Sequence, residues 1–364
     1  MFGSFNSDAE FGRREPGMKM QSLLEQLERD GILPEEAFVE LLSGRSKEDE
    51  AYAAKRAREI GDCIYGKQIY IRGLIEFTNY CKNNCYYCGI QRENSHIQRY
   101  RLGKEEILLC CEEGYKLGFR TFVLQGGEDP YYTDEKMIDI IKAIRNNFPD
   151  CAITLSIGEK SYDSYQRFYE AGADRYLLRH ETADVAHYQR LHPKEMSLEH
   201  RMDCLRQLKE IGFQTGCGFM VGSPFQTNKE LAKDLLFIHS LHPEMVGIGP
   251  FIPHKETRFA KEKQGTLEQT LFLLSLIRIM EKNVLLPATT ALATIDPRGR
   301  EKGILAGANV VMPNLSPKAV REKYALYDGK VCTGEEAAEC RFCLENRVRS
   351  VGYEVVVDRG DYKG

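Results

Sequence analysis

From Lys67 onward, short runs of β-branched or aromatic residues alternate with longer segments of amphipathic helical periodicity. The runs that we expect to be strands are 68–77, 121–125, 152–157, 175–179, 214–221, 245–251, 286–290 and 309–312. The expected helices between them include 104–117, 134–147, 162–171, 198–211 and 229–241. Eight strand–helix units over about 250 residues predict an α/β fold, a parallel (β/α)8 TIM-type barrel, and disfavour a doubly wound open sheet.

The segments outside this alternation suggest the domain organisation. Residues 1–17 are polar with mixed charge, and we expect a disordered leader there. Residues 18–66 place apolar side chains at intervals of three and four, which predicts an N-terminal helical extension. The barrel is expected over residues 67–314, and a small C-terminal segment that contains further cysteines over residues 315–364.

Composition excludes several classes of function. A formal net charge of −4 gives no basic field for nucleic acid. No apolar run approaches the roughly 20 residues that a membrane-spanning helix needs, so no membrane contact is expected. Twelve cysteines without a secretory signal are typical of reduced thiols and metal ligands. We therefore expect a cytoplasmic protein, and we expect it to be a monomer.

Three cysteines follow the first expected strand at C-x3-C-x2-C spacing: Cys81, Cys85 and Cys88. Such a set can bind three irons of a [4Fe-4S] cluster, which normally takes four protein ligands. The fourth iron then stays open for a small molecule. The alternative is a zinc site, which usually adds a fourth Cys or His at short spacing. The first histidine downstream is His96, and the spacing favours the iron-sulfur cluster.

Other chemically active residues stand where expected strands end. Gly126, Gly127 and Glu128 follow the second strand, and two glycines let the main chain approach a ligand closely. Later strands end at Ser156, at Arg179 and Glu181, at Phe251, Ile252 and His254, at Thr289 and Thr290, and at Met312. Active sites of (β/α)8 barrels lie at this end of the strands. One site is therefore predicted to collect all of these residues.

The cysteine motif, with Tyr87 before its last cysteine, resembles the signature of radical S-adenosylmethionine (SAM) enzymes. The resemblance implies that SAM chelates the open iron and that one electron from the cluster splits it to a 5′-deoxyadenosyl radical. It makes the three cysteines the catalytic centre. By the same resemblance, the residues that bind SAM are Tyr87, Gly126, Gly127, Glu128, Ser156, Glu181 and Arg201.

Four further segments resemble one subgroup, the HydE family of [FeFe]-hydrogenase maturases. They are 176–183 (YLLRHETA), 247–254 (GIGPFIPH), 287–291 (PATTA) and 307–314 (GANVVMPN). The resemblance implies an organometallic Fe(CO)2(CN)–cysteine substrate on the route to the diiron subsite of the hydrogenase. It also implies a reductant such as ferredoxin or flavodoxin, and other hydrogenase maturases as partners. Biotin synthase and methylornithine synthase are similar relatives, and a small organic substrate of that kind is the alternative.

In the HydE reading, a substrate cavity lies below the cluster. Its expected lining residues are Arg179, Phe251, Ile252, His254, Thr289, Thr290 and Met312. Arginine and threonine side chains can bind a carboxylate or a small anion inside an otherwise apolar cavity. Barrel packing is the alternative role, and it is the favoured one for Ile252 and Met312.

A second cysteine set, Cys332, Cys340 and Cys343, lies in the C-terminal segment. It resembles the auxiliary cluster site of some HydE proteins, which implies a [2Fe-2S] or [4Fe-4S] cluster there; a loose zinc site is the alternative. Two other classes remain for the whole chain: a zinc-dependent barrel hydrolase and an iron-sulfur scaffold that needs no SAM pocket. The Gly126–Glu128 segment behind the cysteine motif favours the SAM enzyme over both.

Overall fold

The computed structural model describes residues 16–331, 333 and 337–364, so nearly all of the expected leader lies outside the described residues. Six parallel strands form one sheet in the order β2-β3-β4-β5-β6-β8. Their bounds are Gly73–Thr78, Thr121–Gly126, Ala152–Ser156, Arg175–Leu177, Gln214–Cys217 and Met245–Val246. Single bridges then join Met245 to Leu285 and Pro287 to Val310. β10 (Val310–Val311) pairs with β1 (Gln68–Ile71), which closes the ring beside β2 and confirms the predicted (β/α)8 barrel.

Three expected strands are divided in the structure, and a fourth forms only single bridges. Expected strand 214–221 divides into β6 and β7 (Met220–Val221) at Gly218, where an added Cβ would lie 2.0 Å from the Gly247 carbonyl oxygen. Expected strand 245–251 divides likewise into β8 and β9 (Gly249–Pro250), which pairs with β7.

Expected strand 286–290 forms only single bridges, and α11 (Thr290–Ile295) begins at its last residue. Pro287 has no N–H to donate to a ladder, which explains the short pairing. Expected strand 68–77 is divided between β1 and β2 at Arg72, whose N–H bonds to the Val311 carbonyl.

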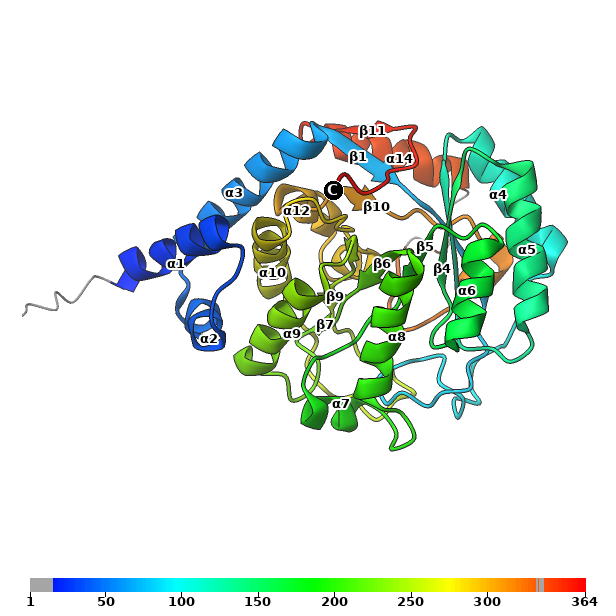
Figure 1. Cartoon of the computed structure of the whole chain (residues 1–364), viewed down its shortest axis with the longest axis horizontal. Coiled ribbons are helices and arrows are strands. Elements are labelled where there is room, and N and C mark those ends of the chain that lie inside the picture. Colours follow the sequence, from blue (N-terminus) through cyan, green and yellow to red (C-terminus); the bar gives the residue numbers. More distant parts are fainter. Residues whose placement is uncertain (1–15, 332, 334–336) are drawn as a thin grey trace, which may run out of the picture.

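Helices cover the outside of the barrel (Figure 1). They are α4 (Lys104–Lys116), α5 (Asp134–Asn147), α6 (Tyr162–Glu170), α7 (Val185–Leu191), α8 (Leu198–Ile211), α9 (Asn228–Leu241), α10 (Leu267–Met280) and α12 (Gly299–Leu305). Hydroxyl N-caps start several of them; Thr133, Ser161 and Ser197 each accept a hydrogen bond from a first-turn N–H. The apolar core lies between these helices and the strands. No helix among the described residues has the length and apolar character to cross a bilayer.

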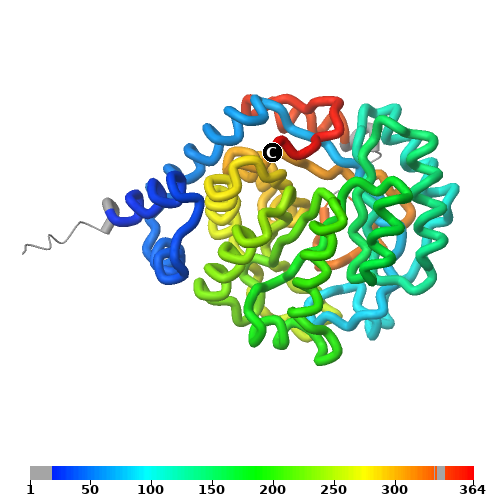
Figure 2. The backbone as a smooth tube through the Cα atoms, in the orientation of Figure 1, coloured from blue at the N-terminus to red at the C-terminus, as the bar shows by residue number. Residues whose placement is uncertain are grey.

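Three helices precede the barrel: α1 (Pro16–Asp30), α2 (Glu35–Gly44) and α3 (Lys47–Tyr65). α3 packs along α10 and α2 packs against α9, so the N-terminal helices lie on one flank of the barrel (Figure 1). α13 (Lys318–Arg321), α14 (Ala337–Arg349) and β11 (Glu354–Val356) follow it. β11 pairs with β1, which brings the C-terminal segment beside the start of the barrel (Figure 2).

The last residues of the chain close the amino-terminal end of the barrel. Arg175, the first residue of β5, is fully buried there and donates hydrogen bonds to the Arg359 carbonyl at 2.8 Å and to Asp361 Oδ1 at 2.6 Å. Arg359 also pairs with Asp361, at 2.8 Å. Burial would raise the pKa of Asp361, but the hydrogen bonds from Arg359 and Arg175 hold it well below its usual range.

We expect Asp361→Ala to lower the free energy of unfolding by about 2 kcal/mol, because it leaves the buried Arg175 without its carboxylate partner. This figure is below that for a fully buried pair, since the Asp361 side chain is 39% exposed. Urea denaturation measures it at pH 7. The difference from wild type should shrink below about pH 4, because a carboxylate with a depressed pKa loses its contribution as it becomes protonated. Equal stability of variant and wild type at pH 7 would contradict this role.

Candidate active site

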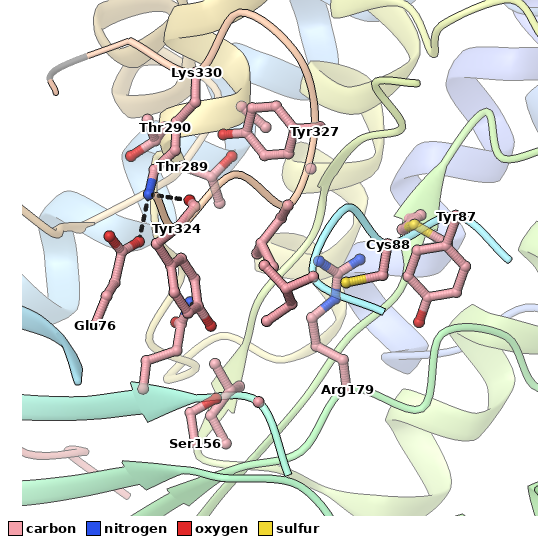
Figure 3. A pocket seen from close by; sticks show the side chains of 18 of the residues that line it. Glu76, Tyr87, Cys88, Ser156, Arg179, Thr289, Thr290, Tyr324, Tyr327 and Lys330 are labelled. Carbon is pink, nitrogen blue, oxygen red and sulfur yellow. Dashed lines mark hydrogen bonds and ion pairs between the residues drawn. The ribbon is translucent and has the colours of Figure 1, made fainter. Parts of the chain in front are cut away.

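A cavity of about 350 Å³ opens at the carboxyl ends of the strands. Most residues predicted from the sequence line it together: Cys81, Cys85, Tyr87, Cys88, Gly126, Gly127, Glu128, Ser156, Arg179, Glu181, Arg201, Phe251, Ile252, Thr289, Thr290 and Met312. Figure 3 shows Cys88 and Tyr87 on one side of the cavity and Glu76, Tyr324 and Lys330 on the other. The barrel thus brings side chains from seven strand ends to one cavity.

The cysteine loop is held by main-chain hydrogen bonds to two other loops. Lys82 N–H donates to the Glu128 carbonyl at 2.8 Å, and Tyr86 N–H donates to the Leu191 carbonyl at 3.0 Å. At least two of the three cysteine sulfurs lie more than 4.8 Å apart. One zinc ion with Zn–S bonds of about 2.3 Å holds thiolates roughly 3.8 Å apart. The wider spacing suits a larger centre, an iron-sulfur cluster, better than a single ion.

The environment of the thiols penalises the thiolate form when no metal ion is bound. Burial and the neighbouring Cys81 raise the pKa of Cys88 to about 12, and burial raises the pKa of Cys85 well above its usual range. Without a metal the thiols are therefore protonated and neutral. Metal ions at their centre would favour the thiolate form of all three. The residues present fit a cluster with three protein ligands.

The Gly126–Glu128 segment runs against the cysteine loop. A Cβ on Gly127 would lie 2.2 Å from the Tyr80 carbonyl oxygen and 2.8 Å from Cys81 Cβ, so only glycine fits. Glu128 Oε2 pairs with Lys82 Nζ at 3.1 Å, and Glu128 Oε1 accepts a hydrogen bond from Glu159 N–H at 3.0 Å. The carboxylate is thus fixed beside the cluster loop and faces the cavity.

Two carboxylate–guanidinium pairs form the next part of the wall. Glu181 has a left-handed backbone (φ 68°), and its Oε2 lies 3.1 Å from Arg179 Nη2. Arg201 is only 8% exposed, although it lies on a helix, and its Nε is 2.7 Å from Glu159 Oε1. Both signs of charge therefore occur within one partly apolar cavity. Such a wall suits a zwitterionic ligand with an amino group and a carboxylate.

The far end of the cavity is less polar. Thr289 Oγ1 is buried and has no hydrogen-bond partner among the described residues, whereas Thr290 Oγ1 accepts one from Arg300 Nη2 at 3.3 Å. A buried hydroxyl without a partner that faces a cavity fits a polar group of a bound molecule.

His254 is a correction to the predicted lining. Its side chain packs against the main chain of Gly89 and lies 3.7 Å from Asp328, outside the cavity. The tight turn after the strand end directs it behind the cysteine loop, where Glu256 N–H donates to His254 Nδ1.

A buried ion pair in the cavity was not predicted. Lys330 Nζ lies 2.5 Å from Glu76 Oε1 and donates to the Tyr324 carbonyl, and Asn314 donates to Glu76 Oε2 at 2.8 Å (Figure 3). Glu76 is 1% exposed. The carboxylate of Glu76, inside the expected strand 68–77, was the one signal that could have identified it. Nothing in the sequence near Lys330 indicates its partner.

The second cysteine set cannot be assembled from the structure. Cys332 and the side chain of Cys340 lie outside the described residues, and Cys343 is exposed on α14.

Comparison with known proteins identifies the chain's relatives. The Radical SAM superfamily profile matches residues 75–238. The [FeFe] hydrogenase maturase subunit HydE of Thermotoga maritima is 43% identical over 346 residues, which are 95% of this chain and 98% of that protein. The chain belongs to the HydE family of radical SAM enzymes. Membership implies a [4Fe-4S] cluster and SAM as cofactors.

Relatives outside the HydE family share the same barrel. The 3-methylornithine synthase of Methanosarcina acetivorans is 30% identical over 79% of this chain and 81% of its own length. A crystal structure of methylornithine synthase superposes with a TM-score of 0.81 at 25% identity, covering 92% of this chain and 97% of that one. The HydE-family chain therefore keeps an architecture that also serves a small organic substrate.

Proposed function

We propose that this protein matures an [FeFe] hydrogenase by reductive cleavage of SAM, acting on an Fe(CO)2(CN)–cysteine species. The observation that carries the proposal is the 43% identity to a hydrogenase maturase subunit along nearly the full length of both chains. The cavity supports it, because the residues predicted for SAM and those predicted for the substrate line one enclosed space. No side chain of a closed zinc site completes the three cysteines among the described residues.

Cys81, Cys85 and Cys88 would hold the cluster, which supplies the electron that splits SAM into methionine and a 5′-deoxyadenosyl radical. Gly127 lets the main chain pass close to the cysteine loop, and Glu128 accepts hydrogen bonds from the SAM amino group. Arg201 is held by Glu159 and offers its guanidinium to the methionine carboxylate.

Tyr87, Gly126, Ser156 and Glu181 complete the SAM-binding wall, with Glu181 fixed by Arg179. Enclosure keeps water away from a primary carbon radical, which would otherwise react with nearly any C–H bond.

Thr289 and Thr290, at the far end of the cavity, and Arg179, on the wall beside Cys88, are the polar groups that bind the carboxylate of the cysteine moiety (Figure 3). Phe251, Ile252 and Met312 supply apolar wall around the metal carbonyl groups. A neutral, weakly hydrated organometallic centre gains from such an apolar surface. Because Thr289 Oγ1 has no partner among the described residues, it is available to a ligand.

A second candidate is a methylornithine synthase-like or biotin synthase-like enzyme with a small organic substrate. The observation that favours it is the structural likeness to methylornithine synthase, which extends over 92% of this chain. The buried Glu76–Lys330 pair would then offer charges for an amino acid substrate.

The test is in vitro maturation of an apo-[FeFe] hydrogenase in an extract that lacks its own HydE subunit. The anaerobically reconstituted protein should restore hydrogen evolution, and Cys81→Ser should not. The same preparation, given lysine and SAM in place of the organometallic species, should form no methylornithine. If the wild-type protein fails to restore hydrogen evolution and forms methylornithine instead, the methylornithine synthase-like function replaces the maturase function.

Several expectations stay predictions. They are the domain boundaries at residues 17, 66 and 314, the auxiliary cluster of Cys332, Cys340 and Cys343, the monomeric state, the cytoplasmic location and the participation of other maturases. A ferredoxin or flavodoxin as reductant also stays a prediction.

A further inference from the structure

The cysteine loop has a second face, which is directed to solvent. Three segments meet there: 82–96, 185–196 and 255–263. Tyr86 N–H bonds to the Leu191 carbonyl, and the Arg258 guanidinium stacks on the Tyr86 ring at 3.7 Å. Gln91 donates a hydrogen bond to the Glu256 carbonyl at 3.0 Å. In Figure 1 the loop after β2 and α7 lie along the lower edge of the view, below the strand ends.

This face is strongly cationic in an acidic protein. The three segments expose eight lysine and arginine side chains and only three glutamates, whereas the whole chain has a net charge of −4. Arg190, Lys194, Arg258, Lys261 and Lys263 have no recorded ion-pair partner among the described residues. All five side chains are exposed, and the guanidiniums of Arg190 and Arg258 lie on aromatic rings. Such an asymmetry orients an acidic partner during encounter.

An apolar spot lies within the cationic rim. Phe225 is 45% exposed and Val185 is 59% exposed. His187, two residues after Val185 on α7, contacts the Pro224 carbonyl at 3.0 Å, which holds the start of α7 against the segment that contains Phe225. Phe225 has a left-handed backbone (φ 70°), packs on Phe259 and carries the Arg190 guanidinium at 3.4 Å. An apolar centre with a charged rim is the usual form of a transient protein interface.

The same face touches a cluster ligand directly. Met196 is partly exposed, and its Sδ lies 3.8 Å from Cys85 Sγ. Lys194 and Arg190 precede it in the same segment. Two contacts therefore lead from the surface to the cysteine loop, one through Met196 and one through Tyr86. SAM and the substrate reach the cluster from the cavity, so this face stays free when they are bound.

We propose that this cationic face docks an acidic one-electron carrier protein, which reduces the cluster. The inference rests on the proposed function, since only a reductively activated cluster needs a donor. One electron leaves the reduced carrier and enters the cluster; the carrier is oxidised and no atom is transferred. The match of an acidic partner to the cationic rim fixes the class of occupant.

The primary test is a binding measurement with oxidised acidic ferredoxin, by calorimetry under anaerobic conditions, at about 20 mM and about 200 mM NaCl. Wild type should bind at low salt and markedly more weakly at high salt. The double reversal Lys194→Glu, Lys261→Glu should weaken binding at low salt at least about tenfold. The matched control is Lys116→Glu, Lys282→Glu, which reverses two exposed lysines near the carboxyl ends of α4 and α10, at the opposite end of the barrel. It should bind as wild type.

A second measurement separates docking from chemistry. SAM cleavage by the Lys194→Glu, Lys261→Glu variant should be unchanged with dithionite and at least about tenfold slower with limiting reduced ferredoxin. Equal ferredoxin affinity of this variant and wild type would overturn the docking site. The docking site would also be overturned if the variant lost as much of its dithionite-driven rate as of its ferredoxin-driven rate, because the substitutions would then affect the cluster itself. If wild type with an assembled cluster fails to cleave SAM with dithionite, the proposed function fails instead, whatever the ferredoxin affinity.

Discussion

Cys81→Ser is expected to abolish reductive cleavage of SAM by dithionite, with a rate at least about a hundredfold below wild type, equivalent to about 2.7 kcal/mol of barrier. Serine oxygen is a poor ligand for iron in place of a thiolate, so the cluster loses one of its three protein ligands. Measurement needs anaerobic reconstitution, iron analysis and quantification of 5′-deoxyadenosine.

The control for this variant is Cys343→Ser, which changes an exposed cysteine of α14 far along the chain from the cysteine loop. Cys340→Ser is a second control. Both variants should retain SAM cleavage, because the auxiliary cysteines do not line the cavity as far as it is described. Cleavage at the wild-type rate by Cys81→Ser would overturn the assignment of the catalytic cluster.

Gly127→Ala is expected to weaken SAM binding at least about a hundredfold while the cluster is largely retained. The added Cβ would lie 2.2 Å from the Tyr80 carbonyl oxygen, so the Gly126–Glu128 segment must move away from the cysteine loop. Glu128 then moves with it and loses its position beside Lys82 of the cysteine loop, where it would bind SAM. Anaerobic equilibrium binding gives the affinity for SAM, and visible absorbance gives the cluster content.

Gly61→Ala is the matched substitution. Gly61 lies inside α3, and its added Cβ would make only ordinary contact, 3.8 Å from Arg278 Nε. Gly61→Ala should leave the affinity for SAM unchanged, and it should stabilise α3 slightly, since alanine is the better helix former. Unchanged affinity in Gly127→Ala would show that the close approach of the two loops is dispensable.

Sequence periodicity predicted the barrel because each strand and helix carries its own local signal. The bounds of α5 and α8 are those expected, since apolar spacing and hydroxyl N-caps are read from neighbouring residues. The prediction was least accurate for the seventh expected strand, 286–290, which forms only single bridges around Pro287. Strand-end position then predicted most of the cavity lining, because a closed barrel brings all such ends together.

Pairings between distant segments could not be predicted in this way. Arg201 was predicted to bind SAM, but its internal partner Glu159 was not recognised. Lys330 meets Glu76 across 254 positions of chain, and neither residue indicates the other. The position of His254 depends on how the turn after β9 packs against Gly89. These details are set by three-dimensional packing, for which a single sequence has no periodic signal.

The cysteine loop lies between the cavity and the solvent. Its inner face meets the cavity, whose wall carries the paired charges of Arg179 with Glu181 and of Arg201 with Glu159. Its outer face meets solvent through Tyr86 and Met196 and is surrounded by cations. In the proposed docking arrangement, the electron donor and SAM therefore approach the cysteine loop from different sides.

Electron paramagnetic resonance of the reduced cluster, recorded with and without SAM, tests the central claim most directly. The account predicts a clear change of the signal when SAM is added, because SAM binds the iron that Cys81, Cys85 and Cys88 leave open. An identical signal in both samples, with iron analysis showing a complete cluster, would mean that the fourth iron is already ligated by the protein, and it would contradict the account.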